Sequence, residues 1–392
     1  MALNGMPLVV LVATLAVASP VLTYVLWGRM AGRTWRLPVR GGLLLTSQLC
    51  AVLLVAVLAN DYGYFYTSWS EVFGTGAVTT AAPPVAVHRG TSAPVPATTS
   101  PAGVVVLGDT GWSSPAQWAT RGRVLSVEVR GGSSGLAEHA YVYLPPQYGA
   151  ASAHHVRLPA AEVMTGYPGH EQSLLTRMKY PDQELAALRV HRTVPMVLVM
   201  LRPAVTQSRD TECTDVPGGP QALTFFGQDV PRAISSAFWV RGDDWAVIGD
   251  STGGYCATKI AMTHADVFRA AVSLSGYYFA LHDHTTGDLW GGSSVLRDLN
   301  DPLWRLAHLP EPPIGLFVSI GRDEHGSSQS YAETMQLQRA VAAAHGPLRL
   351  TCVVLPHGGH NFGTWSALLP RAFSWLAPQL RSEPTPSFRP GW

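Results

Sequence analysis

Residues 248–254 read Ile248-Gly249-Asp250-Ser251-Thr252-Gly253-Gly254, which contains a G-x-S-x-G motif. The apolar run from Trp245 to Ile248 predicts a buried strand before the motif, and Tyr255 to His264 predicts a helix after it. A strand, a tight glycine-flanked turn, a serine and a helix together form a nucleophile elbow. The N-terminus of the helix would favour negative charge on a reacting oxygen. Ser251 is therefore the candidate nucleophile, with a purely structural turn as the alternative in a chain of 38 glycines.

Composition limits the kinds of partner. The 392-residue chain has a formal net charge of +1, and only 14% of its residues are charged, so it has no basic field to bind nucleic acid. Its hydrophobic content of 47% fits a chain whose surplus apolar residues lie in membrane segments.

The N-terminal region contains two uncharged stretches that are each long enough to cross a bilayer, about residues 6–28 and 41–60. The segment from Arg29 to Arg40 between them carries four arginines, which mark the cytoplasmic side. We therefore predict a membrane anchor over residues 1–74, with both outer ends outside the cell and an aromatic cluster at residues 62–69 suited to the outer interface. A cleaved signal peptide is the alternative, but it would need a positively charged start and would leave the second stretch unexplained.

Three segments follow the predicted anchor. Residues 75–104 are rich in Ala, Pro, Thr and Val and contain no aromatic residue, which predicts an extended linker. Residues 105–385 are predicted to form one globular domain outside the cell, and residues 386–392 a C-terminal tail.

The predicted globular domain begins with a hairpin whose strands are Arg123–Val129 and Ala140–Leu144. Apolar strands then alternate with helical stretches, which predicts an α/β fold with a mostly parallel central sheet covered on both faces. The predicted later strands are 160–164, 195–201, 245–248, 270–274, 314–320 and 350–355, and the predicted helices are 174–178, 220–238, 255–264 and 328–345.

Catalytic partners for Ser251 are expected beyond the carboxyl ends of the strands. Gly321-Arg322-Asp323-Glu324 follows one late strand, and His360 lies beyond the last strand. The order serine, acid, histidine is typical of hydrolases of this architecture. His360 would take the serine proton as a base, and Glu324 or Asp323 would orient the imidazole and stabilise its charged form.

The tetrahedral oxygen that forms on such a serine needs two preorganised N–H donors. We predict the backbone N–H of Thr252 as one donor and a group from the loop Thr165-Gly166-Tyr167-Pro168-Gly169 as the other. Because proline has no N–H, Tyr167 is the first choice in that loop and Gly169 the second. Asp250, inside the elbow, is assigned no role in proton transfer.

The remaining titratable residues support plainer interpretations. His357 competes with His360 for the base role but is expected to have a structural or rim position, and His325 is expected to be an exposed loop residue. His282-Asp283-His284 lacks an evident third ligand at fixed spacing, so we predict no metal and no cofactor. One disulfide is possible, with Cys213 and Cys256 preferred because both should lie near the nucleophile helix; Cys352 would then be a buried free thiol.

Taken together, the motifs Gly249–Gly254, Ser273–Tyr277, Gly321–Glu324 and Gly358–Phe362 resemble the "putative esterase" family of α/β-hydrolases, over about residues 105–380. That family includes the enterochelin and feruloyl esterases, S-formylglutathione hydrolase and the antigen 85 mycolyltransferases, and Asp288–Gly292 and Asn300–Trp304 are similar to stretches of the last group. The family pattern G-x-x-[DE] selects Glu324 rather than Asp323 as the acid. The chain departs from the family at Thr165, where histidine or aspartate is usual, and at Tyr167-Pro168, which follow Gly166 in the loop that should supply the second donor.

The resemblance and the membrane segments imply a membrane-anchored serine esterase or acyltransferase that acts on acyl esters outside the cell. Mycolyltransferase-like transfer to a sugar or lipid of the envelope, a peptidase with the same triad, and a non-catalytic envelope-binding domain are the alternatives. The sequence does not predict the acyl group, the acceptor or the oligomeric state.

Overall fold

The computed structural model describes residues 6–30, 37–63, 102–153, 155–206, 209–324 and 330–380. The chain divides into two compact units, Met1–Pro96 and Ala97–Trp392. Residues 75–101 of the predicted linker, His325 and the predicted tail 386–392 lie outside the described residues. The linker prediction extends two residues too far at its end, because the first strand begins at Gly103.

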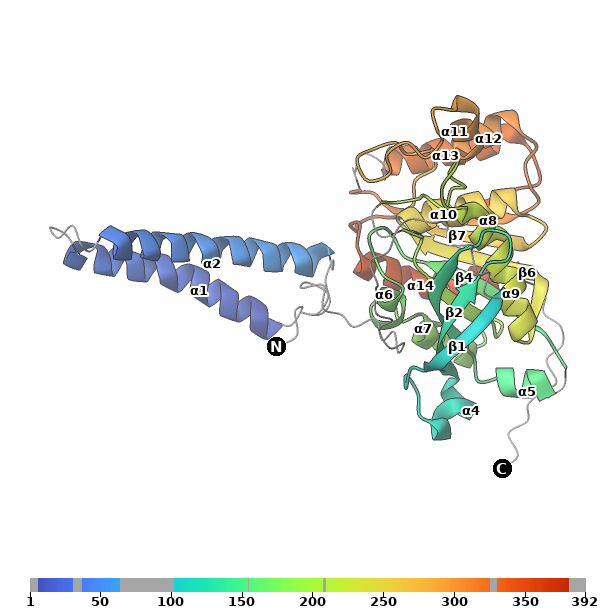
Figure 1. Cartoon of the computed structure of the whole chain (residues 1–392), viewed down its shortest axis with the longest axis horizontal. Helices are drawn as coiled ribbons and strands as arrows, with labels where there is room; N and C mark the ends of the chain where they lie inside the picture. The colour runs from blue at the N-terminus through green and yellow to red at the C-terminus, as the bar shows by residue number, and fades with distance from the viewer. Residues whose placement is uncertain are drawn as a thin grey trace, which may run out of the picture. The chain divides into compact units, whose positions relative to one another are not determined.

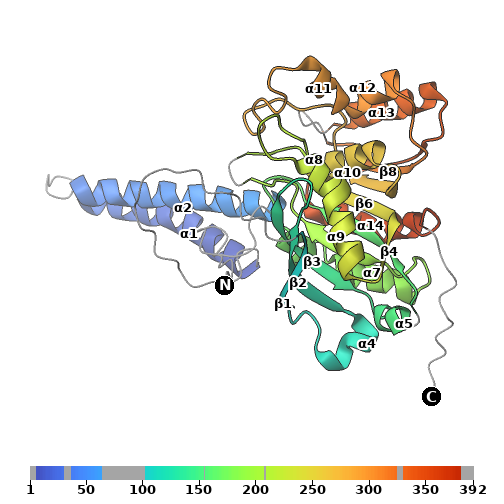
Figure 2. The same cartoon turned by 45° about the vertical axis from the view of Figure 1, so that its right-hand side comes forward.

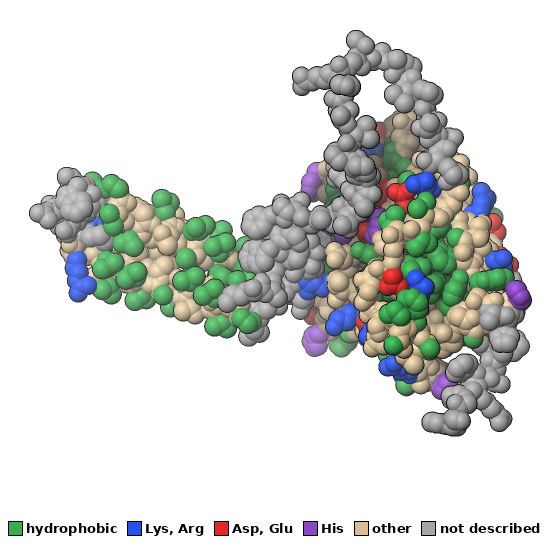
Figure 3. Space-filling model, turned by 60° about the horizontal axis from the view of Figure 1, so that its bottom comes forward, with side chains coloured by type: hydrophobic (Ala, Val, Ile, Leu, Met, Phe, Trp, Pro, Cys, Tyr) green, Lys and Arg blue, Asp and Glu red, His purple; other side chains and the backbone are tan. Residues whose placement is uncertain are grey.

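The N-terminal unit contains two long helices, α1 (Met6–Trp27) and α2 (Leu37–Gly63), with the short turn η1 (Gly28–Met30) after the first. Leu8 and Val12 of α1 pack against Leu54 and Val57 of α2. Hydrophobic side chains also cover the outside of the helix pair (Figure 3). Both helices are long and apolar enough to cross a membrane, over Pro7–Trp27 and Leu37–Asn60.

The second predicted span starts earlier than expected, since α2 begins at Leu37 and includes Arg40. The Arg40 guanidinium donates a hydrogen bond of 2.7 Å to the Trp27 carbonyl and lies 4.6 Å from the centroid of the Trp27 ring. These contacts at the end of α1 explain how an arginine is accommodated in the first turn of α2. The side chains of the predicted aromatic cluster at 62–69 lie outside the described residues.

The second unit is built on a nine-stranded sheet in the order β1-β2-β3-β5-β4-β6-β7-β8-β9 (Figure 1). The strands from β1 to β5 in this order pair antiparallel, and those from β5 to β9 pair parallel. This is the mostly parallel sheet that the sequence predicted. The strands are β1 (Gly103–Asp109), β2 (Arg123–Arg130), β3 (Ala137–Leu144), β4 (Leu158–Met164), β5 (Val197–Leu201), β6 (Val240–Asp250), β7 (Phe268–Leu274), β8 (Gly315–Gly321) and β9 (Arg349–Leu355).

Helices cover both faces of the sheet, each over its own apolar cluster (Figure 2). One face carries α8 (Ala222–Thr224), η4 (Phe225–Asp229), α9 (Val230–Ala237), α10 (Thr252–Thr263), α12 (Pro302–His308) and α13 (Tyr331–Ala344). The other carries α6 (Gln172–Thr176), α7 (Tyr180–Arg189) and α14 (Phe362–Leu376). The short elements η3 (Pro115–Gln117), α4 (Trp118–Arg121), α5 (Tyr148–Ala153) and α11 (Ser294–Leu299) complete the unit.

Two departures from the predicted elements concern the site. β6 begins at Val240, because the polar residues before Trp245 continue the strand. α14 was not predicted, and Pro370 lies inside it. The Asn361 side chain accepts a 3.0 Å hydrogen bond from the Thr364 N–H and so caps the start of α14. His360 therefore precedes a well-defined helix, not an open loop.

Candidate active site

Ser251 lies between the end of β6 and the start of α10, in a strained turn. Its backbone has φ 54° and ψ −123°, a region that non-glycine residues rarely adopt. Its N–H donates to the Leu274 carbonyl at 2.9 Å, and its own carbonyl accepts from Gly254 and Tyr255. The serine is thus fixed between β7 and α10, as a nucleophile elbow requires.

The elbow has no room for side chains at its glycines. A Cβ on Gly249 would lie 2.0 Å from the Gly253 carbonyl oxygen, and one on Gly253 would lie 2.4 Å from the Met164 carbonyl oxygen. A Cβ on Gly166, in the loop after β4, would lie 2.7 Å from the Ser251 Cβ. These close approaches explain why the motif needs glycine on both sides of the serine and why the loop after β4 reaches it.

The structure brings Ser251, His360 and Glu324 together in one line of hydrogen bonds. His360 Nε2 lies 2.9 Å from Ser251 Oγ, and His360 Nδ1 lies 3.0 Å from Glu324 Oε2. Glu324 Oε1 accepts hydrogen bonds of 2.8 Å from the Ser275 hydroxyl and the Gly321 N–H. Glu324 is buried, whereas the His360 side chain is 36% exposed, so the imidazole can be reached from solvent.

Asp323 takes a different position. Its carboxylate lies 3.5 Å from His357 Nδ1, and both side chains are mostly exposed. Of the two candidate acids, only Glu324 contacts His360 in this structure, and His357 does not contact Ser251.

The geometry also distinguishes the candidate N–H donors. Thr252 is the first residue of α10, a position whose N–H has no partner within the helix. The Gly169 N–H donates to the Gly166 carbonyl at 2.7 Å, and the Gly166 N–H donates to Asp250, so neither is free. Within the described ranges the Tyr167 N–H has no acceptor. Among the N–H groups predicted as donors, those of Thr252 and Tyr167 are therefore the two without an acceptor in the described residues.

Asp250, to which the sequence assigned no role, is completely buried beneath the elbow. Its Oδ2 accepts the Gly166 N–H at 3.0 Å. Burial raises the pKa of its carboxyl group to about 7. The sequence shows Asp250 next to Ser251 in the motif, but its hydrogen bond with Gly166 is known only from the fold.

Ser275, which supports Glu324, was quoted only as part of a family motif. It follows β7 directly, so the rule that functional groups lie beyond strand ends could have identified it.

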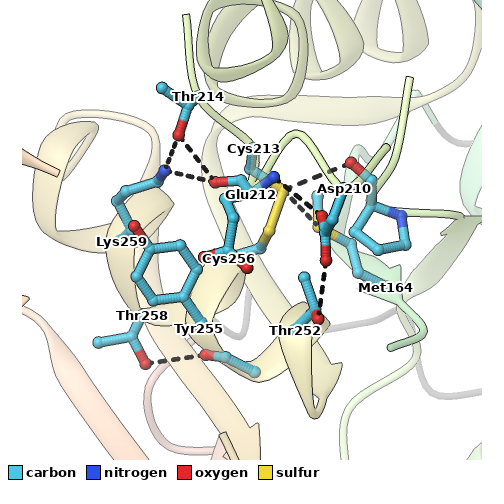
Figure 4. Close-up of a disulfide and its surroundings, with 12 residues drawn as sticks. Met164, Asp210, Glu212, Cys213, Thr214, Thr252, Tyr255, Cys256, Thr258 and Lys259 are labelled. Carbon is cyan, nitrogen blue, oxygen red and sulfur yellow. Dashed lines mark hydrogen bonds between the residues drawn. A yellow bond between two sulfur atoms is a disulfide. The ribbon is translucent and has the colours of Figure 1, made fainter. Parts of the chain in front are cut away.

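A disulfide between Cys213 and Cys256, the predicted pair, joins the segment before α8 to α10 (Figure 4). Beside it, Asp210 Oδ2 accepts a 3.2 Å hydrogen bond from the Thr252 hydroxyl. Burial raises the pKa of Asp210 to about 6. The disulfide thus holds a buried polar segment against the first turn of the nucleophile helix.

On the other side of the disulfide the Lys259 ammonium donates to Thr214 Oγ1 at 2.9 Å and to the Glu212 carbonyl (Figure 4). Burial lowers the pKa of Lys259 to about 7. Cys352 lies in β9 and is half-buried, so it is less enclosed than the buried thiol we predicted. Its pKa is raised by burial.

The His282-Asp283-His284 segment makes only local contacts in the described structure. The His282 ring packs edge-on against Trp290, and Asp283 Oδ1 accepts from the N–H groups of Thr285 and Thr286. The described residues contain no group of three side chains arranged to hold a metal ion.

A family model described as "Putative esterase" matches residues 135–376, more than half of the chain. The chain belongs to this esterase family. The resemblance stated from its motifs is therefore confirmed.

An uncharacterized protein of Corynebacterium glutamicum is 23% identical to this esterase-family chain over 254 residues, which cover 62% of this chain. The match covers 57% of the relative, so the chain spans little more than half of its length.

Among solved structures, an S-formylglutathione hydrolase from Agrobacterium tumefaciens superposes with a TM-score of 0.57 at 13% identity and covers 70% of this chain and 100% of its own. A ferulic acid esterase gives 0.55 at 17% identity, covering 66% and 98%. Mycobacterium tuberculosis MPT51 gives 0.51 at 16% identity, covering 65% and 97%. At these identities the likeness concerns the fold, and it establishes the α/β-hydrolase architecture that the sequence predicted.

Proposed function

We propose that this esterase-family protein is a membrane-anchored serine esterase or acyltransferase that forms an acyl-enzyme on Ser251. The observation that carries the proposal is the continuous hydrogen-bonded line from Ser251 Oγ through His360 to Glu324, with the serine on a strained elbow.

In the proposed mechanism Ser251 Oγ attacks the carbonyl carbon of an ester while His360 Nε2 takes its proton. The carbonyl oxygen becomes negative and accepts hydrogen bonds from the N–H groups of Thr252 and Tyr167. Buried Glu324 stabilises the imidazolium that forms. His360 then gives the proton to the leaving alcohol as its bond to the acyl carbon breaks.

The second half of the reaction reverses these steps with a new nucleophile. Water or another alcohol loses a proton to His360 and attacks the acyl carbon, and the returning proton restores the Ser251 hydroxyl. Water gives hydrolysis, and a sugar or lipid hydroxyl of the envelope gives transfer.

The anchor and the side of the membrane form a further part of the proposal. Two helices have the length and hydropathy of membrane spans, and the short segment between them holds Arg29, Arg33 and Arg36. Positive loops favour the cytoplasmic side, which would place the esterase unit outside the cell. Reporter fusions after Arg36 and after Gly76 should be found on opposite sides of the membrane; the same side for both would exclude this topology.

Mass spectrometry of the acyl-enzyme tests the chemistry. The full chain, purified in detergent, is mixed with a p-nitrophenyl ester, quenched with acid and digested. We expect the acyl mass on the peptide that contains Ser251, and faster turnover of esters than of matched p-nitroanilides. Acylation of another peptide, or none at all, would support a non-catalytic domain, and preference for anilides would support a peptidase.

A further inference from the structure

One buried carboxyl group lies under the proposed site without taking part in the mechanism. Asp250 is 0% exposed, immediately precedes Ser251 and closes β6. Its Oδ2 accepts the Gly166 N–H at 3.0 Å, while its Oδ1 has no hydrogen-bond partner in the described part of the chain. Burying a carboxyl group with one unpaired oxygen costs more free energy than burying an amide or an apolar side chain at the same place.

The hydrogen bond from Gly166 places that carboxyl next to the second proposed oxyanion donor. Gly166 approaches the nucleophile closely, because a Cβ built on it would lie 2.7 Å from the Ser251 Cβ. Its carbonyl accepts the Gly169 N–H at 2.7 Å. In a planar trans peptide the C=O and the next N–H point in opposite directions, so the Tyr167 N–H points away from Gly169.

Gly166 is therefore held on both sides, by Asp250 at its N–H and by Gly169 at its carbonyl. The first contact ties the loop to the residue before the nucleophile, and the second is internal to the loop. Only the first fixes the distance between the loop and the elbow.

We propose that Asp250 is a positioning residue of the oxyanion hole, whose carboxyl group holds Gly166 and thereby aims the Tyr167 N–H at the acyl oxygen on Ser251. The inference rests on the proposed function of Ser251. Asp250 does not touch the reacting atoms, and its effect is transmitted through one backbone hydrogen bond.

Two substitutions separate hydrogen bonding from charge. Asp250→Asn keeps an acceptor for the Gly166 N–H, and Asp250→Ala removes it. Loss of one oxyanion donor costs about 10²- to 10³-fold in kcat, so Asp250→Ala should lower kcat by roughly that factor with little change in KM. Asp250→Asn should recover most of the activity. Asp250→Leu, which fills the volume without an acceptor, repeats the test if the alanine variant does not fold.

Glu184 of α7 provides a matched control. It is also completely buried, and its carboxylate accepts a hydrogen bond of 3.2 Å from the Met196 N–H. Glu184→Ala should lower the melting temperature but leave the kcat of the folded fraction near that of the wild type. A trifluoromethyl ketone, which adds to the serine and forms an oxyanion, provides the second measurement. The inhibition constant of the ketone should rise in Asp250→Ala in proportion to the loss in kcat/KM. It should stay unchanged in Glu184→Ala.

Three results would overturn the inference: full kcat in a folded Asp250→Ala or Asp250→Leu, equal losses in Asp250→Ala and Glu184→Ala, or unchanged ketone affinity in Asp250→Ala. Failure of the proposed function looks different, because then the wild type itself would turn over no ester and Ser251→Ala would match it.

Discussion

The described part of the chain contains two Ser–His–Glu sets with the same hydrogen-bond connectivity. In one, His360 lies 2.9 Å from Ser251 and 3.0 Å from Glu324. In the other, His139 Nε2 lies 2.8 Å from the Ser126 hydroxyl, and its Nδ1 lies 2.8 Å from Glu171 Oε1. Judged by side-chain distances alone, the two sets are equivalent.

Their backbones are not equivalent. Ser126 sits in the middle of β2, where it is paired with Gly108 of β1 on one side and Tyr141 of β3 on the other. Ser251 instead has a positive φ and stands at the N-terminus of α10, with two unpaired N–H groups available. A strand interior provides neither an exposed hydroxyl on a turn nor free donors for an oxyanion. The difference shows that the turn and its donors, more than the hydrogen-bonded side chains, distinguish a proposed nucleophile.

The second set supports a loop of the proposed site and does not carry its chemistry. Glu171 follows the loop that carries Tyr167, so the His139–Glu171 pair ties the far end of that loop to β3. Asp250 ties the near end to the elbow.

Replacing each of the two histidines should give the largest difference in activity between the two sets. His360→Ala removes the proposed base and should lower kcat by about 10⁴-fold or more, as removal of a triad member does in other serine enzymes. His139→Ala, which loosens only the far end of the oxyanion loop, should lower kcat far less than His360→Ala does. Ester turnover by both purified variants is the measurement, and a comparable loss in His139→Ala would show that the two sets are not functionally distinct.

Replacing the proposed acid, Glu324, should give the next largest effect on kcat. Glu324→Gln should reduce kcat by roughly 10³- to 10⁴-fold, because the amide cannot stabilise the imidazolium. Asp323→Asn, an exposed neighbour that contacts His357 instead, is the matched control and should have almost no effect. Steady-state kinetics of the pair decides the point; a larger loss in Asp323→Asn would transfer the acid role to that residue.

The disulfide affects stability more than chemistry. Cys213 and Cys256 close a loop with a sequence separation of 43 residues. Replacing both by alanine should lower the free energy of unfolding by about 2–4 kcal/mol. Denaturant titration of the full chain should show this loss, while His139→Ala, which touches no cross-link, should cost less. Equal stability of the double variant and the wild type would contradict the assigned role of the disulfide.

The smallest effects concern pH, and they should have opposite signs at the two ends of the oxyanion loop. Burial raises the folded pKa of Asp250 from 3.8 to about 7, with the buried Tyr180 hydroxyl of α7 as the ionisable group facing it. The folded state then binds more protons than the unfolded state between these values, so wild-type stability falls as pH rises from about 4 to 7. Asp250→Asn should therefore gain stability over the wild type across that window.

At the other end, burial alone would raise the pKa of Glu171, but hydrogen bonds from His139 and from its own backbone outweigh it and lower the pKa below 4.5. This carboxylate contributes stability above its unfolded pKa that is lost as pH falls through the folded pKa. Glu171→Gln should be less stable than the wild type at pH 6 and nearly equal at the most acidic pH tested. Thermal melts of both variants across the pH range are the measurement, and slopes of the same sign would contradict the assignment.

Much of the site could be predicted because its residues stand at strand ends. Ser251, Glu324 and His360 each follow a parallel strand, and strand ends of a parallel sheet meet at one edge. The strands from β2 onward and their alternation with helices were likewise visible in the apolar runs, whereas β1 and the order of the strands in the sheet were not predicted.

The remainder depends on partners that sequence does not place. The bond from Gly166 to Asp250 joins residues 84 positions apart, and that from Thr252 to Asp210 spans 42. His139 and Ser126 meet only because β2 and β3 pair in one particular register. α14 was missed since Pro370 interrupts a helical pattern, and the start of β6 was missed because its first residues are polar and partly exposed.

Labelling with a fluorophosphonate probe tests the distinction between the two sets most directly. The full chain in detergent, Ser251→Ala and Ser126→Ala are treated with the probe, and the labelled peptide is identified by mass spectrometry. We expect the wild type and Ser126→Ala to be labelled on the peptide that contains Ser251, and Ser251→Ala to remain unlabelled. Undiminished labelling of Ser251→Ala, or loss of labelling in a folded Ser126→Ala, would contradict the claim that the elbow carries the nucleophile.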